Sequence, residues 1–124
     1  MKFETQQTKL GTFHQELYKK MDIYVHLIYK LSKKFPKEEL YGTTSQLRRA
    51  ALSVILNYIE GYARQHDKVH QNFLEISYGS LKESRYLTEF SYKRSYLSEK
   101  NYQELEKLAH RIGAMVWGII SKLK

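Results

Sequence analysis

The sequence predicts an all-α protein, an up-down-up-down antiparallel four-helix bundle. Its 124 residues include one proline and six glycines, so the chain has few obligatory breaks. Apolar residues recur at steps of three and four, which is the spacing of one helix face, and no segment alternates as a strand would. Four such segments with short connections favour antiparallel neighbours. We expect a single domain over residues 1–124, with residues 1–11 flexible.

Sequence signals place four helices along the chain, near residues 12–34, 43–65, 67–95 and 98–123. The first helix ends before Pro36, because proline disfavours helical backbone in the residue before it. Thr43 and Gln46 have the spacing of a capping box that opens the second helix. Asp67 and Ser98 are the expected N-caps of the third and fourth helices, since short polar side chains accept hydrogen bonds from free backbone N–H groups.

Each helix has apolar positions that we expect in the core. In the first helix they are Phe13, Leu17, Met21, Tyr24, Ile28, Leu31 and Phe35. In the second they lie beside a polar stripe, at Leu47, Ala50, Ala51, Val54, Tyr58 and Ala63. In the third they are Val69, Phe73, Ile76, Ser80, Leu87 and Phe90. In the fourth they are Leu105, Leu108, Ile112, Met115, Ile119 and Leu123.

A polar stripe runs along the second helix at steps of three and four, through Gln46, Arg49, Ser53, Asn57, Glu60 and Arg64. In an antiparallel hairpin that turns near residue 66, three pairs should face each other: Arg49 with Glu83, Ser53 with Gly79, and Asn57 with Glu75. We interpret the stripe, together with Glu83, as a satisfied polar seam, because buried ions require partners. Two alternatives remain: a subunit interface or ligand groove, and a catalytic site.

Composition indicates a basic protein of the cytoplasm. There is no cysteine, so neither a disulfide nor a Cys-based zinc site can stabilise the fold. The N-terminal residues contain no apolar core of a signal peptide, and no apolar run is long enough to span a bilayer, so we expect no membrane partner. Lys and Arg number 21 against 13 acids, for a net charge of +8. Such an excess is typical of nucleic-acid binding, although it also serves simple solubility.

The segment FPKEELYGTTSQLRRAALSVILNYIEGYAR, followed by NFLEISYGSLKES, resembles the bacterial four-helix-bundle family encoded within intervening sequences of 23S ribosomal RNA genes. Residues on the family pattern are Pro36, Tyr41, Gly42, Gln46, Arg48, Arg49, Ala50, Ser53, Asn57, Glu60, Gly61, Arg64, Gly79, Ser80 and Glu83. The resemblance implies a four-helix bundle that assembles as a ring-shaped pentamer. It also implies an architecture similar to the accessory protein of diversity-generating retroelements, a basic barrel associated with nucleic acid and a reverse transcriptase. The family has no firmly assigned biochemical activity.

Catalytic and metal-binding motifs are absent from the sequence. His66 and His70 have the spacing of a metal-binding helix, but Asp67 is expected to start a new helix between them, which would break the register of the two ligands. The Glu-x-x-His motif of di-iron bundles, the glycine-rich phosphate loops and the nucleophile elbow are all missing. We therefore expect no catalytic residue, no metal, no cofactor and no enzymatic activity.

Basic residues should gather at one end of the bundle, because the first and third connections of an up-down-up-down bundle lie together. The candidate nucleic-acid-binding residues there are Lys30, Lys33, Lys34, Lys37, Arg48, Lys93, Arg94 and Lys100. Tyr29 and Tyr92 place aromatic rings beside these cations, a combination that stacks bases while it contacts phosphates. The alternative is that the lysines are only solvated and the tyrosines pack between helices or subunits.

We expect self-association, because apolar residues outnumber the positions of one bundle core. The surplus residues are Leu52, Ile55, Leu56, Ile59, Trp117 and Ile120. The leading hypothesis is an oligomeric, non-enzymatic RNA- or DNA-binding accessory factor that acts through phosphate contacts. The alternative is a structural oligomer that scaffolds a protein partner without nucleic acid. The expected partners are further copies of the chain in a homopentamer, RNA or DNA, and a protein encoded nearby.

Overall fold

The computed structural model describes residues 9–124, which form four long α-helices and one short 3-10 helix. The elements are α2 (Lys9–Ser32), η1 (Lys37–Glu39), α3 (Thr43–Tyr62), α4 (Asp67–Lys93) and α5 (Glu99–Leu123). The predicted helices are therefore confirmed, with ends that differ by a few residues. Of the segment expected to be flexible, residues 1–8 lie outside the described part of the chain, whereas residues 9–11 belong to α2.

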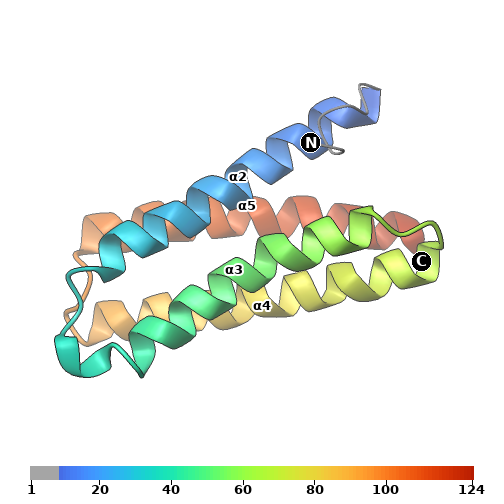
Figure 1. Ribbon diagram of the computed structural model, residues 1–124. Coiled ribbons are helices and arrows are strands. Elements are labelled where there is room, and N and C mark those ends of the chain that lie inside the picture. Colours follow the sequence, from blue (N-terminus) through green and yellow to red (C-terminus); the bar gives the residue numbers. More distant parts are fainter. Residues whose placement is uncertain (1–8) are drawn as a thin grey trace.

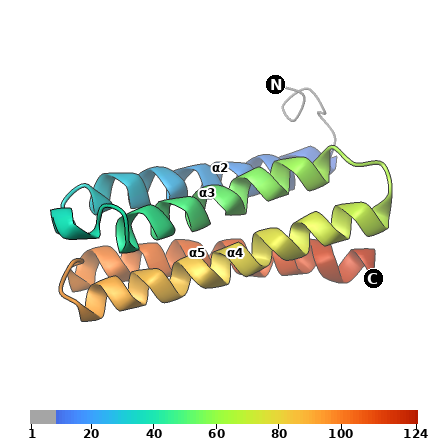
Figure 2. The same cartoon turned by 60° about the horizontal axis from the view of Figure 1, so that its bottom comes forward.

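The four helices form the predicted antiparallel bundle (Figures 1 and 2). Each helix packs against two others, α2 against α3 and α5, and α4 against α3 and α5. The α2–α3 and α4–α5 connections lie at one end, and the α3–α4 connection lies at the other end with the start of α2 and the end of α5 (Figure 2). Helix α2 is tilted relative to the other three (Figure 1). None of the helices within residues 9–124 has the length and hydropathy of a membrane-crossing segment.

The caps at the helix starts follow the prediction only in part. Ser98 is the N-cap of α5, and its hydroxyl accepts a hydrogen bond of 3.1 Å from the Asn101 N–H. Helix α3 does not use the predicted capping box: the Thr43 N–H donates instead to Oε1 of Glu39, at 3.1 Å. The N-cap of α4 is His66, which forms no side-chain capping bond, and Asp67 is the first helical residue. The preceding 3-10 helix supplies Glu39, which the local sequence of α3 could not reveal.

The core contains most of the apolar positions predicted for α2 and α5. Leu17, Met21, Tyr24 and Ile28 of α2 are buried, whereas Phe13 is 38% exposed. In α5 the buried face is turned slightly from the prediction and comprises Leu105, Ala109, Ile112, Gly113, Met115, Val116 and Ile120. Ile120, which the sequence assigned to surplus apolar surface, is fully buried, as is nearly all of Ile55 in α3.

The predicted core face of α4 is confirmed at Ser80, which is buried, and at Leu87, which packs against the core, but it is wrong elsewhere. Val69 and Ile76 are exposed, and the buried residues recur at alternating steps of three and four through Leu74, Ser77, Leu81, Ser84, Thr88 and Ser91. The serines and the threonine of this set can be buried because their hydroxyls donate to backbone carbonyls. Ser84 donates to the Leu81 carbonyl at 2.8 Å and also bonds to the hydroxyl of Tyr24, at 2.8 Å.

Small residues bring α3 and α4 close together. The hydroxyl of Ser77 donates to the backbone carbonyl of Val54 at 2.6 Å, so one helix bonds directly to the main chain of the other. The hydroxyls of Ser53 and Ser80 share a hydrogen bond of 2.7 Å. Ser53 therefore pairs with Ser80, the residue next to its predicted partner Gly79.

We predict that two glycine-to-alanine substitutions have opposite effects on stability. An added Cβ at Gly61 of α3 would lie 2.9 Å from Cβ of Phe73 and 3.2 Å from the backbone oxygen of His70, both on α4. Gly61→Ala should lower the free energy of unfolding by about 1–3 kcal/mol, because the crowded helices must move apart. At Gly79 of α4 an added Cβ meets no atom within 4 Å. Gly79→Ala should stabilise by about 0.5–1 kcal/mol through helix propensity. Urea unfolding of both variants measures the difference, and equal effects would contradict a close contact at Gly61.

Candidate nucleic-acid interface

The two connections at one end of the bundle contact each other. The rings of Phe35 and Tyr96 lie with their centroids 5.4 Å apart, and the Tyr96 hydroxyl donates to Oε2 of Glu39 at 2.9 Å. Tyr96 reaches this position because Ser95 adopts a left-handed backbone with φ of 67°. The N–H groups of Ser95 and Tyr96 then bond back to the last turn of α4, a Schellman motif. One continuous surface therefore spans both connections.

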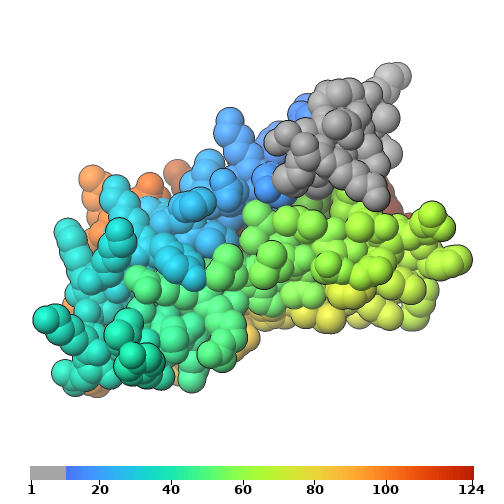
Figure 3. Space-filling view, viewed as in Figure 1, coloured from blue at the N-terminus to red at the C-terminus, as the bar shows by residue number. Residues whose placement is uncertain are grey.

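The predicted cations lie at this end of the bundle. In Figure 3 this end is at the left, where the segment between α2 and α3 is seen. All but Arg48 are exposed: Lys30, Lys33, Lys34, Lys37, Lys93, Arg94 and Lys100. Lys93 forms an ion pair of 3.5 Å with Glu89 on the same exposed helix face, which is worth little in water. The other cations belong to no ion pair among the described residues.

Carboxylates at this end are fewer than cations, and one of them is engaged in the fold. They are Glu38, Glu39, Glu89 and Glu99. Glu39 accepts hydrogen bonds from the Thr43 N–H and the Tyr96 hydroxyl. The bond from the Thr43 N–H, with that from Tyr96, holds the pKa of Glu39 below its usual value. Glu39 therefore stays ionised and fixes the connection, and the surrounding exposed charges are mainly positive.

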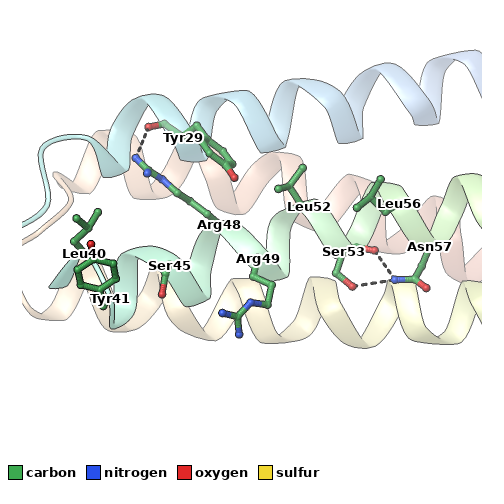
Figure 4. A pocket seen from close by; sticks show the side chains of 10 residues that line it. All are labelled: Tyr29, Leu40, Tyr41, Ser45, Arg48, Arg49, Leu52, Ser53, Leu56 and Asn57. Atoms are coloured by element: carbon green, nitrogen blue, oxygen red, sulfur yellow. Dashed lines mark hydrogen bonds between the residues drawn. The ribbon is translucent and has the colours of Figure 1, made fainter.

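Arg48, one of the candidate nucleic-acid-binding residues, is engaged in the fold. Its Nε donates to the Ser32 hydroxyl at 2.8 Å, and its Nη2 donates to the Tyr29 carbonyl at 3.4 Å. The guanidinium also lies over the Tyr29 ring, 4.7 Å from its centroid. Arg48 therefore caps the C-terminus of α2, where unpaired carbonyls attract a cation. Figure 4 shows its side chain reaching from α3 to α2.

We predict that Arg48→Gln destabilises the protein by about 1–2 kcal/mol, because the variant cannot make the hydrogen bonds from a charged group to the end of α2. Lys34→Gln removes an exposed cation from the same end and should change stability by less than about 0.5 kcal/mol. Thermal and urea unfolding of both variants provide the measurement. Equal stabilities would show that Arg48 contributes nothing to the end of α2.

Each of the two tyrosines predicted to stack on bases, Tyr29 and Tyr92, has another side chain against its ring. Arg48 covers the ring of Tyr29. Tyr92 stacks on Tyr102 of α5, with centroids 4.8 Å apart and planes 4° from parallel. Tyr41, in the connection between α2 and α3, is instead 91% exposed. The family pattern contains this residue, but nothing in the local sequence indicated that its ring would face solvent.

The polar stripe of α3 is not a buried seam, and this part of the prediction is wrong. Gln46, Arg49, Glu60, Arg64 and Glu83 are exposed. Arg49 and Glu83 form no ion pair with each other, and Arg64, just after the end of α3, pairs with Glu60 of that helix. Only two members are half-buried and bonded: the Asn57 amide donates to the carbonyl and the hydroxyl of Ser53, both at 2.9 Å (Figure 4). The charged members are exposed to solvent instead.

An open groove of about 590 Å³ lies over the exposed side of α3 (Figure 4). Its walls mix apolar and polar side chains: Tyr29, Leu40, Tyr41, Ser45, Arg48, Arg49, Leu52, Ser53, Leu56 and Asn57. Leu56 is 54% exposed, and Leu40 is exposed to a similar extent. The groove adjoins the basic end through Tyr41 and Arg48. The groove includes three members of the polar stripe, Arg49, Ser53 and Asn57.

Residues that could hold a metal ion do not cluster within residues 9–124, where no group of three His, Cys, Asp or Glu side chains is found. His66 is exposed in the connection before α4, whereas the ring of His70 packs edge-on against Tyr62, with centroids 6.2 Å apart. The two imidazoles thus have different surroundings.

Comparison with known proteins identifies one family and one similar fold. The family model of the 23S rRNA-intervening sequence protein matches residues 14–118. A crystal structure of a protein of unknown function from the S23 ribosomal protein family of Bacteroides thetaiotaomicron has a TM-score of 0.76 and 20% sequence identity. That match covers 84% of this chain and 97% of the other chain. A search among curated proteins found no match.

Proposed function

The chain belongs to the 23S rRNA-intervening sequence protein family, and on that premise we propose that it is a non-enzymatic accessory protein that binds RNA or DNA through phosphate contacts. One observation carries the proposal. Exposed cations from α2, η1, α4 and α5 gather at one end of the bundle, while Glu39, a carboxylate at the same end, is engaged in the fold. A surface with this charge attracts a polyanion.

Such a surface is better suited to contacts with the phosphate backbone of a nucleic acid than to recognition of base edges. The cations are lysines on flexible stems and one exposed arginine, Arg94, and they lie on helix ends and connections. They do not form a helix face shaped to enter a groove, which sequence-specific readers use. Tyr41 is the one exposed ring of the α2–α3 connection on which an unpaired base could stack. We therefore expect little sequence preference and a bias toward single-stranded regions.

Replacement of four cations tests the nucleic-acid interface. Lys33→Gln, Lys34→Gln, Lys93→Gln and Arg94→Gln, combined in one variant, should weaken binding of a generic single-stranded RNA almost equally across sequences. A plot of log affinity against log salt concentration has a negative slope. The magnitude of this slope should decrease by about one for each phosphate that the variant no longer neutralises. Fluorescence anisotropy over a salt series gives both quantities.

A control variant that loses the same number of positive charges elsewhere distinguishes the effect of where the cations lie from the effect of net charge. Lys19→Gln, Lys68→Gln, Lys82→Gln and Lys107→Gln remove four lysines from other parts of the helices. This variant should retain most of the affinity, because its basic end is intact. Equal weakening in both variants would mean that net charge alone drives binding. No weakening in the first variant would reject the interface and favour a scaffold that binds a protein partner.

Self-association is part of the proposal, because the groove over α3 exposes apolar side chains beside the basic end. An oligomer that buries this groove would repeat the cations around its axis, and a pentamer is the assembly that the family resemblance implies. The surplus of apolar surface is smaller than the sequence suggested, since Ile55 and Ile120 are in the core. Leu56 and Trp117 remain largely exposed.

We predict that Leu56→Glu dissociates the oligomer, because a buried charge without a partner is costly. Ile76→Glu places the same charge at a comparably exposed position on α4 and should leave assembly intact. Sedimentation velocity at micromolar concentration distinguishes the variants. A parent protein that sediments as a monomer would reject self-association, and dissociation by Ile76→Glu alone would move the interface to α4.

A further inference from the structure

A second pocket lies at the opposite end of the bundle from the basic connections. It has a volume of about 450 Å³ and is bounded by the first described turns of α2, the start of α4 and the C-terminal half of α5. Helix α2 rises away from α5 in this region (Figure 1). Its lining includes Phe13 and His14 from α2, His70 from α4, and Arg111, Met115 and Lys122 from α5. The volume is within the usual range for small-molecule sites.

The wall that α5 contributes is apolar in the middle and cationic at both ends. Ala114, Met115, Gly118 and Ile119 lie between Arg111 and Lys122, which are three helical turns apart, a rise of about 16 Å. Gly118 leaves room in this wall, because a Cβ there would meet no atom within 4 Å. Within the described part of the chain, no carboxylate lines the pocket. An elongated apolar molecule with a negative group therefore complements it in shape and charge.

His70 contributes an imidazole to the wall of the pocket. Its Nε2 is buried and has no hydrogen-bond partner among residues 9–124. The neighbouring lining residue His14 bonds through Nδ1 to the Tyr58 hydroxyl at 2.7 Å. Burial lowers the pKa of both histidines, so neither adds a charge to the wall at neutral pH.

We propose that this pocket binds a small amphipathic anion, a monocarboxylate with an unbranched apolar chain. The chain would lie along Met115, Gly118 and Ile119, and the carboxylate would interact with Arg111 or Lys122. The site is separate from the basic end, so its occupation does not depend on nucleic-acid binding.

Decanoate below its micelle concentration is the probe, with decyltrimethylammonium as the probe of opposite charge. Methyl NMR of the protein labelled at methionine reports where the probe lies, because Met115 lines the pocket whereas Met21 is in the core and does not. Decanoate should shift the Met115 resonance in a saturable manner and leave Met21 nearly unchanged. Calorimetry should give an affinity for decanoate at least about tenfold above that for the cationic probe.

Two matched pairs of variants test the pocket itself. Gly118→Leu fills the pocket, whereas Gly79→Leu adds the same side chain at an exposed helical glycine outside it. Only the first should abolish decanoate binding. Arg111→Gln with Lys122→Gln should weaken decanoate by about tenfold, and Lys82→Gln with Lys107→Gln should not. An unshifted Met115, equal binding by both leucine variants, or equal affinity for the two probes would overturn the proposal.

Discussion

The close contact between α3 and α4 is the constraint on which the rest of the bundle depends. Ser77 bonds to the main chain of α3 at Val54, and Gly61 leaves space for Phe73 and the backbone of His70. Two helices can approach this closely only where side chains are small and their hydroxyls are paired. The contact fixes the register of the hairpin. It thereby determines which faces of α3 and α4 remain for α2, α5 and solvent.

The sequence predicted the architecture well because helix periodicity and chain breaks are local signals. The core face of α4 was mispredicted because hydrophobicity alone places Ile76 inside and both Ser77 and Ser84 outside. The hydroxyls of these serines are satisfied in part by the Val54 carbonyl and by Tyr24, which are remote in sequence. The pairing of Arg49 with Glu83 was also mispredicted, because both side chains are exposed and form no ion pair with each other.

The candidate interface was predictable at the level of segments but not of single atoms. Bundle topology alone brings the lysines of α2 to the same end as Lys93 and Arg94. That Arg48 caps α2 depends on the distance between two helices, which no sequence pattern contains. The exposure of Tyr41 and the opening beside Gly118 likewise depend on how the helices are tilted. The two ends of the bundle thus differ: one presents exposed cations on its two connections, and the other has a pocket whose apolar wall lies between Arg111 and Lys122.

Disulfide trapping tests the α3–α4 register most directly, because the chain has no cysteine of its own. The hydroxyls of Ser53 and Ser80 are 2.7 Å apart, so cysteines at these positions can be bridged with little movement of the backbone. Oxidised Ser53→Cys/Ser80→Cys should form an intramolecular disulfide readily, detected by mass spectrometry of the digested protein. Ser53→Cys/Gly79→Cys, the pairing expected from the sequence, should form it much more slowly. Faster bridging of the second pair would contradict the register on which this account of the bundle depends.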